Sequence, residues 1–300
     1  MSKYYSKDGI NIHLCDNLVL LRQMKDESIN LIYCDILYNT GKKFDDYNDN
    51  LGTPQEAVEW YRPRFIEMRR ILTANGSIFI HCNWRLNSYI RILMDEVFGG
   101  ENFRNTIYRK HSEERGFYKN FDSQMDTILY YCKNKDDFVF HEIRSQKQSI
   151  VPLFENGYIR ERSEIREING ILIGIGAKNM HWLVPKKQFD EMVKHGEVEL
   201  INGLPYRFST VKPIGNLWDE PEMLDTYNRT GKANAYDTPK PEAVLERIIL
   251  MCSNENDVIA DFFMGGGTTA VVTKRLGRRG VFCDISEKAC RVTVSKLEKV

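Results

Sequence analysis

Strand-like apolar runs that alternate with helical patterns constrain the fold of this chain more than any other feature. Such runs end on Asp16, Asp35 and Asp284. Helical patterns follow them, in the case of Asp35 after a polar loop over residues 39–52. Strands separated by helices are typical of a parallel sheet with helices on its faces. The pattern therefore predicts an α/β fold with a mostly parallel, twisted sheet. Residues 54–72 also show helical spacing, and Pro63 is expected to kink or restart that helix.

The alternation stops in the middle of the chain. Two short apolar segments flank Asn202-Gly203, which is a strong signal for a β-hairpin, and no strand–helix–strand pattern surrounds them. We therefore expect residues 1–150 and 236–300 to form one α/β domain. Residues 151–235 are expected to form a small inserted domain.

The charge and the cysteine and histidine spacing limit how this chain can bind nucleic acids and metals. Lys and Arg total 42, as do Asp and Glu, so the formal net charge is zero and a nucleic acid would have to be held by local clusters of charge. The seven cysteines form no C-x-x-C pair and the six histidines no H-E-x-x-H motif, so we expect no metal site.

The N-terminal segment lacks the apolar run of a signal peptide, and no stretch approaches the roughly 20 apolar residues of a membrane span. These features predict a cytoplasmic protein without a membrane partner.

A glycine-rich loop near the end of the sequence indicates a ligand site. Gly265–Gly267 lies between a strand-like run and a helical pattern, and Asp284 ends the next run. Glycines let a nucleotide or nucleoside approach the backbone, and the acid accepts hydrogen bonds from ribose. The spacing also fits the NAD pattern, so a dehydrogenase is one alternative. However, the carboxylate of Asp261 would repel a pyrophosphate by about 1–4 kcal/mol, whereas it suits the ammonium group of S-adenosylmethionine.

A second group of polar residues follows the run that ends on Asp35. Residues 35–41 have the sequence DILYNTG. Ligands of open α/β sheets bind at the carboxyl ends of the strands. We therefore expect residues 35–38 and 261–267 to lie at one edge of the sheet and to share a ligand.

Together these segments resemble a known family. Residues 35–41 are similar to the D-P-P-Y-N-T-G signature of the S-adenosylmethionine-dependent DNA amino-methyltransferases, and residues 261–269 (DFFMGGGTT) are similar to their D-P-F-x-G-x-G-T-T cofactor loop. Residues 238–242 (TPKPE) resemble the T-x-K-P-E segment that precedes this loop. The catalytic motif comes before the cofactor loop, which is the permuted order of the β class. The resemblance implies a circularly permuted, Rossmann-like methyltransferase fold in which the inserted domain recognises the target.

The chain departs from the family pattern at three prolines. Their positions are occupied by Ile36, Leu37 and Phe262. Ile36 still provides a backbone carbonyl, because every residue carries one, and what is lost is the rigidity that proline gives the loop. We therefore expect the chain to be active, with a degenerate fold that binds DNA without catalysis as an alternative.

The resemblance assigns roles to individual residues. In this family the Asp and the carbonyl of the next residue accept hydrogens from the target amino group, and the Tyr stacks on the flipped base; here these are Asp35, Ile36 and Tyr38. Asp284 would hold the ribose and Asp261 the methionine end of the cofactor. The residues expected to bind S-adenosylmethionine are Asp16, Asp35, Thr238, Lys240, Asp261, Phe263, Gly265, Gly267, Thr268 and Asp284. The basic residues expected to contact DNA are Arg109, Lys110, Arg115, Lys119, Lys186 and Lys187.

The implied function is site-specific methylation of the exocyclic amino group of a flipped base in double-stranded DNA. Asp rather than Ser at position 35 favours adenine N6 over cytosine N4 in this family, and the cytosine reaction stays an alternative. Methylation of RNA or protein is a further alternative. Many members of this class form dimers, and members act together with a restriction endonuclease. The resemblance therefore makes a second copy of the chain and a restriction endonuclease candidate partners.

Overall fold

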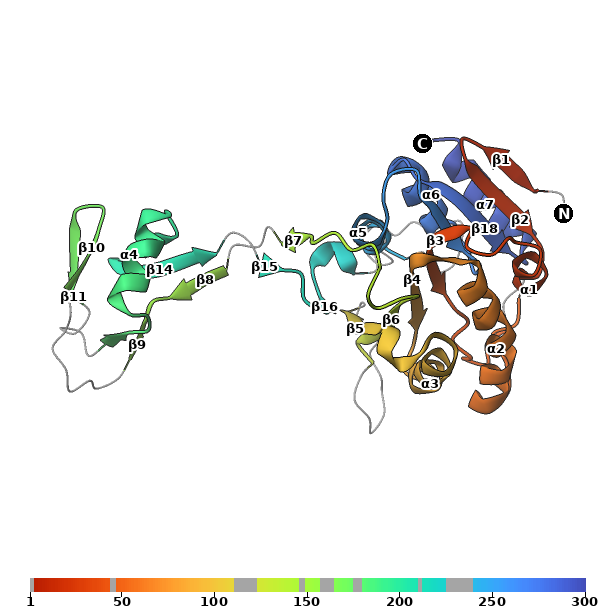
Figure 1. Cartoon of the computed structure of the whole chain (residues 1–300), viewed down its shortest axis with the longest axis horizontal. Coiled ribbons are helices and arrows are strands. Elements are labelled where there is room, and N and C mark those ends of the chain that lie inside the picture. Colours follow the sequence, from red (N-terminus) through yellow and green to blue (C-terminus); the bar gives the residue numbers. More distant parts are fainter. Residues whose placement is uncertain are drawn as a thin grey trace. The chain divides into compact units, whose positions relative to one another are not determined.

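The computed structural model describes residues 3–43, 47–110, 123–145, 149–156, 165–174, 180–209, 212–224 and 240–300. The chain forms two compact units, one made of residues 1–141 and 215–300 and the other of residues 142–214 (Figure 1). The smaller unit begins and ends earlier than the expected insertion of 151–235. One reason is that Leu217–Trp218 pairs with a strand of the larger unit.

The larger unit is built on a nine-stranded sheet within the described residues, in the order β1-β2-β18-β17-β3-β4-β6-β5-β16. The strands from β2 to β4 in this order are parallel, and β6 runs antiparallel to both of its neighbours. The mostly parallel sheet agrees with the predicted α/β fold. The strands are β1 (Tyr5–Lys7), β2 (Ile10–Leu14), β3 (Ile29–Asp35), β4 (Leu72–Cys82), β5 (Phe103–Lys110), β6 (Met125–Cys132), β16 (Leu217–Trp218), β17 (Val258–Asp261) and β18 (Arg279–Asp284).

Helices cover both faces of this sheet (Figure 1). On one face, α1 (Asn17–Leu21), α2 (Pro54–Ile71) and α3 (Asn87–Phe98) pack their apolar side chains against the sheet, together with Ile32 and Cys34 of β3. On the other face, α6 (Thr268–Arg275) and α7 (Glu287–Leu297) pack against β2 and β18, and α5 (Glu242–Cys252) lies beside α6. Side chains alternate along each strand, so both faces of this sheet are apolar. A short 3₁₀ turn, η1 (Gly100–Asn102), leads into β5, and a second, η3 (Pro221–Met223), follows β16.

The strand order brings the two ends of the chain together. β17 comes from the C-terminal part of the sequence, yet it pairs in parallel with β3, with Ile259 opposite Leu31. The carboxyl ends of both strands therefore lie at the same edge of the sheet. This confirms the prediction that residues 35–38 and 261–267 converge.

Helix α2 corrects one expectation. It begins with a capping box in which Thr53 and Glu56 bond each other's backbone N–H groups, and it continues without interruption to Ile71 although Pro63 lies inside it. Of the two expected effects of Pro63, a kink or a restart of the helix, the restart is wrong. Proline costs roughly 3 kcal/mol inside a helix, and the burial of Tyr61 and Phe65 on the core side of α2 offsets this cost, since a buried aromatic contributes about 1.5–3 kcal/mol.

The smaller unit has its own apolar core. Helix α4 (Lys186–Lys194) packs Phe189 and Met192 onto Leu153, which lies between two short strands, and onto Val198 of a third strand. Asn202 and Gly203 both have positive φ and form the predicted hairpin turn between β13 and β14. Its elements are β7 (Arg144–Ser145), β8 (Ser149–Pro152), β9 (Phe154–Asn156), β10 (Ile165–Ile168), β11 (Ile171–Gly174), β12 (Met180–Trp182), α4 (Lys186–Lys194), β13 (Val198–Ile201), β14 (Leu204–Ser209) and β15 (Lys212–Pro213).

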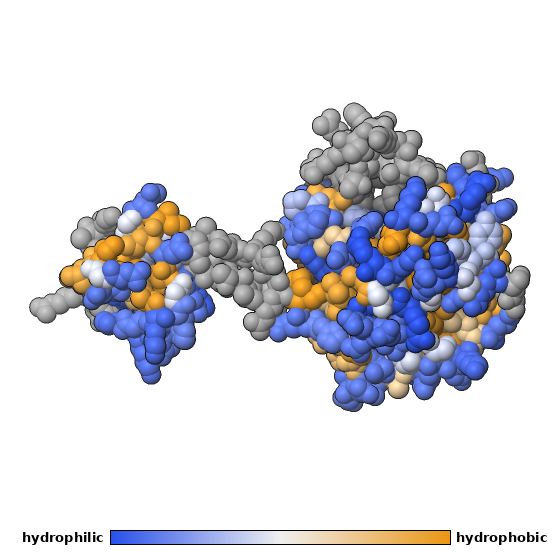
Figure 2. All heavy atoms as spheres, turned by 90° about the horizontal axis from the view of Figure 1, so that it is seen from above, coloured by the Kyte–Doolittle hydropathy of each residue, from blue (hydrophilic) through white to orange (hydrophobic). Residues whose placement is uncertain are grey.

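Hydrophilic side chains dominate the face of the larger unit seen in Figure 2, with a few apolar areas between them. Within the part of the chain that the structure describes, no helix has both the length and the apolar character needed to cross a membrane.

Candidate functional site

A pocket of about 400 Å³ opens at the carboxyl edge of the parallel strands of the larger unit. Acidic residues that end or follow adjacent strands line it: Asp16 after β2, Asp284 of β18, Asp261 of β17 and Asp35 of β3. Other residues of its wall are Phe263, Gly265, Gly266, Thr268 and Lys240. Residues of the N-terminal motif (35–41) and of the glycine loop (265–267) thus line the same pocket.

The glycine loop is held by its own backbone and by Asp284. Gly265 and Gly267 have φ of 51° and 75°, in the left-handed region that favours glycine. The N–H of Gly265 donates to Asp284 Oδ2 over 2.8 Å. A Cβ on Gly267 would lie 2.2 Å from Thr293 Oγ1, so this position needs glycine for space as well as for φ.

We expect Gly267→Ala to destabilise the protein more than Gly277→Ala. Both positions have positive φ, 75° and 71°, but a Cβ on Gly277 meets no atom within 4 Å. The control variant should therefore cost only about 1–2 kcal/mol for backbone strain, while Gly267→Ala should cost about 1–3 kcal/mol more for overpacking against Thr293. Urea unfolding of the two variants measures the difference, and equal losses would mean that Thr293 moves away freely.

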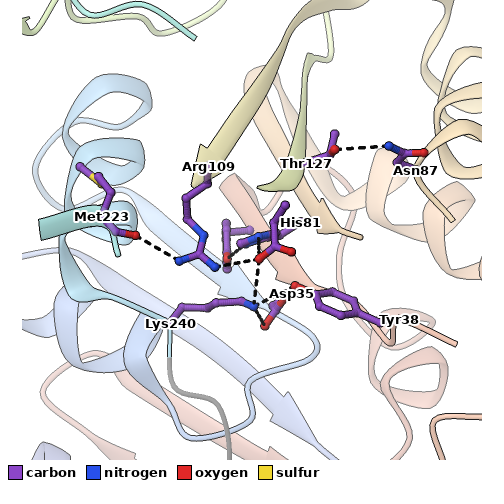
Figure 3. Close-up of polar contacts among 10 residues, drawn as sticks. Asp35, Tyr38, His81, Asn87, Arg109, Thr127, Met223 and Lys240 are labelled. Atoms are coloured by element: carbon purple, nitrogen blue, oxygen red, sulfur yellow. Dashed lines mark hydrogen bonds and ion pairs between the residues drawn. The ribbon is translucent and has the colours of Figure 1, made fainter. Parts of the chain in front are cut away.

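The end of β3 forms a hydrogen-bonded group with Lys240 (Figure 3). Tyr38 Oη donates to Asp35 Oδ1 over 2.8 Å, and Lys240 Nζ lies 2.8 Å from Tyr38 Oη and 3.3 Å from Asp35 Oδ2. Burial and the neighbouring Asp35 carboxylate raise the pKa of Tyr38 well above its ordinary value, so the phenol is protonated and can donate. The Ile36 side chain is buried, and its N–H donates to His81 O over 3.2 Å.

The loop after Tyr38 is fixed by a residue that the sequence did not reveal. Asp49 is 4% exposed. Its Oδ1 accepts from the N–H of Asn39 over 2.9 Å, and its Oδ2 accepts from the N–H and hydroxyl of Thr40 over 3.0 and 2.5 Å. Asn39 has a positive φ of 52°. These bonds fix the backbone of the two residues that follow Tyr38.

The acidic side chains of the pocket differ in environment. Asp261 is 2% exposed and accepts from Thr269 Oγ1 and Phe263 N over 2.7 and 2.9 Å. Burial raises its pKa to about 7. Asp16 is half-buried, caps α1 by accepting from Leu18 N over 2.8 Å, and forms an ion pair of 3.0 Å with Arg64.

Most of the predicted cofactor residues lie in this pocket. Its wall includes Asp16, Asp35, Lys240, Asp261, Phe263, Gly265, Thr268 and Asp284. Gly267 lies behind the loop at the start of α6 rather than in the wall. Thr238 is outside the described residues.

Those of the predicted DNA-binding residues that the structure describes differ in their exposure to solvent. Arg109 is 1% exposed, and its guanidinium donates to Asp126 Oδ2 over 2.7 Å and to Met223 O over 3.1 Å, so its assignment as a surface contact for DNA phosphate is wrong. Side chains alternate along β5, which leaves Tyr108 exposed and turns Arg109 inward. Lys110 is half-buried, and Lys186 and Lys187 are exposed on α4. Arg115 and Lys119 lie outside the described residues.

Two further groups of site residues were missed. Trp60 lines the pocket, and Arg64 stacks 3.3 Å from its ring centroid; their spacing of four residues in a helix is a signal that could have paired them. His81 and Asp126 lie beside Lys240 and Arg109 (Figure 3). They come from β4 and β6, and only the register of the sheet brings them together.

Known proteins of one kind are similar to this chain. The chain is 27% identical to the type II methyltransferase M.EcaI of Enterobacter cloacae, over 94% of this chain and 68% of that protein. It is 23% identical to the DNA adenine methyltransferase YhdJ of Escherichia coli K12, over 94% of this chain and 81% of that protein. It spans 55% of the type III Mod subunit StyLTI of Salmonella typhimurium, at 25% identity.

Solved structures share the fold. The PvuII cytosine-N4-specific DNA methyltransferase superposes with a TM-score of 0.57 at 13% identity, over 95% of this chain and 85% of that one. The M1.HpyAVI complex with SAM superposes with a TM-score of 0.54 at 17% identity, over 95% and 98% of the two chains. The sequence profile of the DNA methylase family matches residues 29–295. With the Gly loop and the Asp35–Tyr38 segment meeting in one pocket, the chain belongs to the DNA methylase family.

Proposed function

We propose that this chain methylates the N6 amino group of adenine in double-stranded DNA, with S-adenosylmethionine as the methyl donor. The observation that carries the proposal is the shared pocket, in which the acidic end of β3 lies beside the glycine loop that follows β17. A relative named as a DNA adenine methyltransferase, YhdJ, supports adenine. The fold shared with a cytosine-N4 enzyme keeps cytosine as the second candidate.

The residues of the pocket fit S-adenosylmethionine. Its amino acid part carries an ammonium group, and Asp261 offers a buried carboxylate beside a loop where backbone can approach a ligand closely. Asp284 and Asp16 are acceptors on the adjoining strands, suited to ribose hydroxyls and adenosine. When bound, S-adenosylmethionine supplies a methyl group on a positively charged sulfur, which is already a good leaving group.

The chain's own residues then position the acceptor. A base in a duplex must leave the stack to reach the pocket. Asp35 and the carbonyl of Ile36 would accept the two N–H groups of its amino group and orient the nitrogen lone pair toward the methyl carbon. Tyr38 would provide a stacking surface, worth about 1–3 kcal/mol. Catalysis would thus come mainly from positioning, and the chemistry requires no metal.

A transfer assay tests the proposal. Purified chain is incubated with tritiated S-adenosylmethionine and, in separate arms, mixed-sequence duplex DNA, RNA and protein. Label should enter only DNA, and hydrolysis should yield N6-methyladenine. N4-methylcytosine would favour the second candidate, and binding of S-adenosylmethionine without transfer to any acceptor would favour a degenerate fold.

The hydrogen bonds between Asp49 and the loop after Tyr38 lead to a further prediction. Asp49→Ala removes three hydrogen bonds to Asn39 and Thr40, so the neighbouring catalytic segment should lose its fixed position. We expect kcat to fall about fivefold to tenfold while the Kd for S-adenosylmethionine changes less than about twofold. Asp136→Ala, at a side chain that is 75% exposed and pairs with Lys135, is the control without effect. A kcat for Asp49→Ala equal to that of this control would show that Asp49 is dispensable.

Target recognition is assigned to the smaller unit. Its exposed Lys186 and Lys187 on α4 are candidates for phosphate contacts, as are Lys110, Arg115 and Lys119. We further propose the permuted β-class motif order and action on DNA in the cytoplasm. We also propose a restriction endonuclease as functional partner, since one relative is named a type II methyltransferase and another the Mod subunit of a type III restriction-modification enzyme. A homodimer is proposed from the resemblance alone.

A further inference from the structure

Lys240 is placed between two carboxylates. Its Nζ lies 3.3 Å from Asp35 Oδ2 and 3.9 Å from Asp126 Oδ2, and it donates to Tyr38 Oη over 2.8 Å. Asp35 and Tyr38 are the residues that would handle the base, whereas Asp126 comes from β6 and is absent from the pocket wall. Figure 3 shows the Lys240 side chain extending toward Asp35, with the dashed lines starting from its ammonium end.

Asp126 is part of a buried cluster in which charges balance. It is 7% exposed, and its Oδ2 accepts from Arg109 Nη2 over 2.7 Å and from His81 Nε2 over 3.2 Å. Burial acts to raise the pKa of Asp126, but the bond from His81 and the charges of Lys240 and Arg109 outweigh it and hold the pKa far below its ordinary value. Two cations, Arg109 and Lys240, therefore face two anions, Asp126 and Asp35.

His81 is the neutral member of this cluster. It is fully buried, and burial followed by the charge of Lys240 lowers its pKa. Its Nδ1 lies 2.8 Å from Tyr33 Oη. A neutral ring that accepts from Tyr33 and donates from Nε2 to Asp126 satisfies both contacts. His81 thus orients the Asp126 carboxylate from the β4 side, while Arg109 orients it from β5.

The cluster gives Asp126 a function beyond packing. Lys240 precedes α5 by two residues, and its ammonium nitrogen lies within 4 Å of carboxylates on two strands, β3 and β6. We propose that Asp126 is a positioning residue for methyl transfer, which holds the Lys240 ammonium against Asp35 and Tyr38 without touching DNA or cofactor. This inference rests on the proposed function, because it names Asp35 and Tyr38 as the groups that meet the base.

If Asp126 had a purely structural role, the expected effect of replacing it would differ. If Asp126 only neutralised Arg109, its replacement would affect the protein by the same factor whether or not Lys240 is present. If Asp126 acts through Lys240, its replacement matters only while the ammonium is there. A double-mutant cycle separates the two cases, because it isolates the interaction between the residues.

The cycle uses the full chain with Asp126→Asn, Lys240→Met and the double variant, assayed at saturating S-adenosylmethionine and at a temperature where circular dichroism shows each to be folded. We expect Asp126→Asn to lower kcat about tenfold and to leave the Kd for S-adenosylmethionine within about twofold. In the Lys240→Met background the same change should alter kcat less than about twofold. A tenfold loss in both backgrounds, or no loss in either, would overturn the proposal.

Two controls complete the design. Asp95→Asn breaks an Arg–Asp pair of 3.1 Å on α3, outside the pocket wall, and should leave kcat unchanged. If Asp126→Asn does not fold, because the buried Arg109 guanidinium would lose its carboxylate partner, Asp126→Glu keeps a carboxylate beside it and displaces that carboxylate. The same cycle and criteria apply. Wild-type chain that transfers no methyl group would overturn the proposed function itself, a result distinct from every outcome of the cycle.

Discussion

Replacing Asp35 by Asn is expected to lower kcat for methyl transfer by about 100-fold to 1,000-fold, the range found when one group that stabilises the transition state is removed. The carboxylate would accept an N–H of the target amino group, and the amide oxygen of Asn is a weaker acceptor without charge. The Kd for S-adenosylmethionine should change less than about threefold. Isothermal titration with the cofactor and single-turnover transfer to DNA measure the two quantities.

Asp16→Asn is the matched control for this experiment. Asp16 lines the same pocket but follows β2, which β18 and β17 separate from the strand that carries Asp35, and it pairs with Arg64. It should raise KM for S-adenosylmethionine and leave kcat at saturation nearly unchanged. If the two variants gave the same pattern, or if Asp35→Asn kept its turnover, Asp35 would not be the catalytic acceptor.

The affinity for S-adenosylmethionine is expected to rise about tenfold between pH 5.5 and pH 7. Burial raises the pKa of Asp261 to about 7, so the carboxyl is mostly protonated at the lower pH and half ionised at the upper. An α-amino group, with a pKa of about 7.7–8.0, stays charged over this range. Ionised Asp261 attracts that ammonium, whereas protonated Asp261 does not. Asp261→Asn should remove the pH dependence and weaken binding about tenfold or more at pH 7.

The same carboxyl affects stability with the opposite dependence on pH. Its folded pKa lies above the ordinary value of 3.8, so the folded chain binds more protons than the unfolded chain between these values. The contribution of Asp261 to the free energy of unfolding is therefore largest below pH 4 and is lost as the pH rises toward 7. Thermal unfolding of wild type and Asp261→Asn without cofactor isolates this contribution, since the other titrating groups are common to both: the Tm of wild type relative to the variant should fall as the pH rises from 4 to 7. A wild-type Kd that is equal at pH 5.5 and pH 7 would contradict the assignment of Asp261 to the ammonium.

Local chemistry explains which parts of the fold could be predicted. The run from Ile29 to Cys34 is mostly apolar, and the loop at Gly265–Gly267 carries its signal in three adjacent residues. The turn at Asn202-Gly203 needs only two residues with positive φ. Each of these features depends on neighbours in the sequence, so the sequence was sufficient.

Features that depend on distant partners could not be predicted. Arg109 looks like a surface charge in the sequence, and only the register of β5 against β6, with Arg109 opposite Asp126, shows that it is buried and paired. Asp49 is one acidic residue in a polar loop until its contacts with Asn39 and Thr40 are known. The short strand β16 pairs with β5 across more than a hundred residues, and no local pattern marks it.

Single-base sequencing of modified DNA from cells that express the chain tests the central claim most directly. Cells expressing wild type should carry N6-methyladenine at one recurring sequence, and cells expressing Asp35→Asn at an equal level should carry none. Adenines that stay unmodified although the purified wild-type chain is folded and binds S-adenosylmethionine, or adenines that are methylated equally by the variant, would contradict an active adenine methyltransferase centred on Asp35.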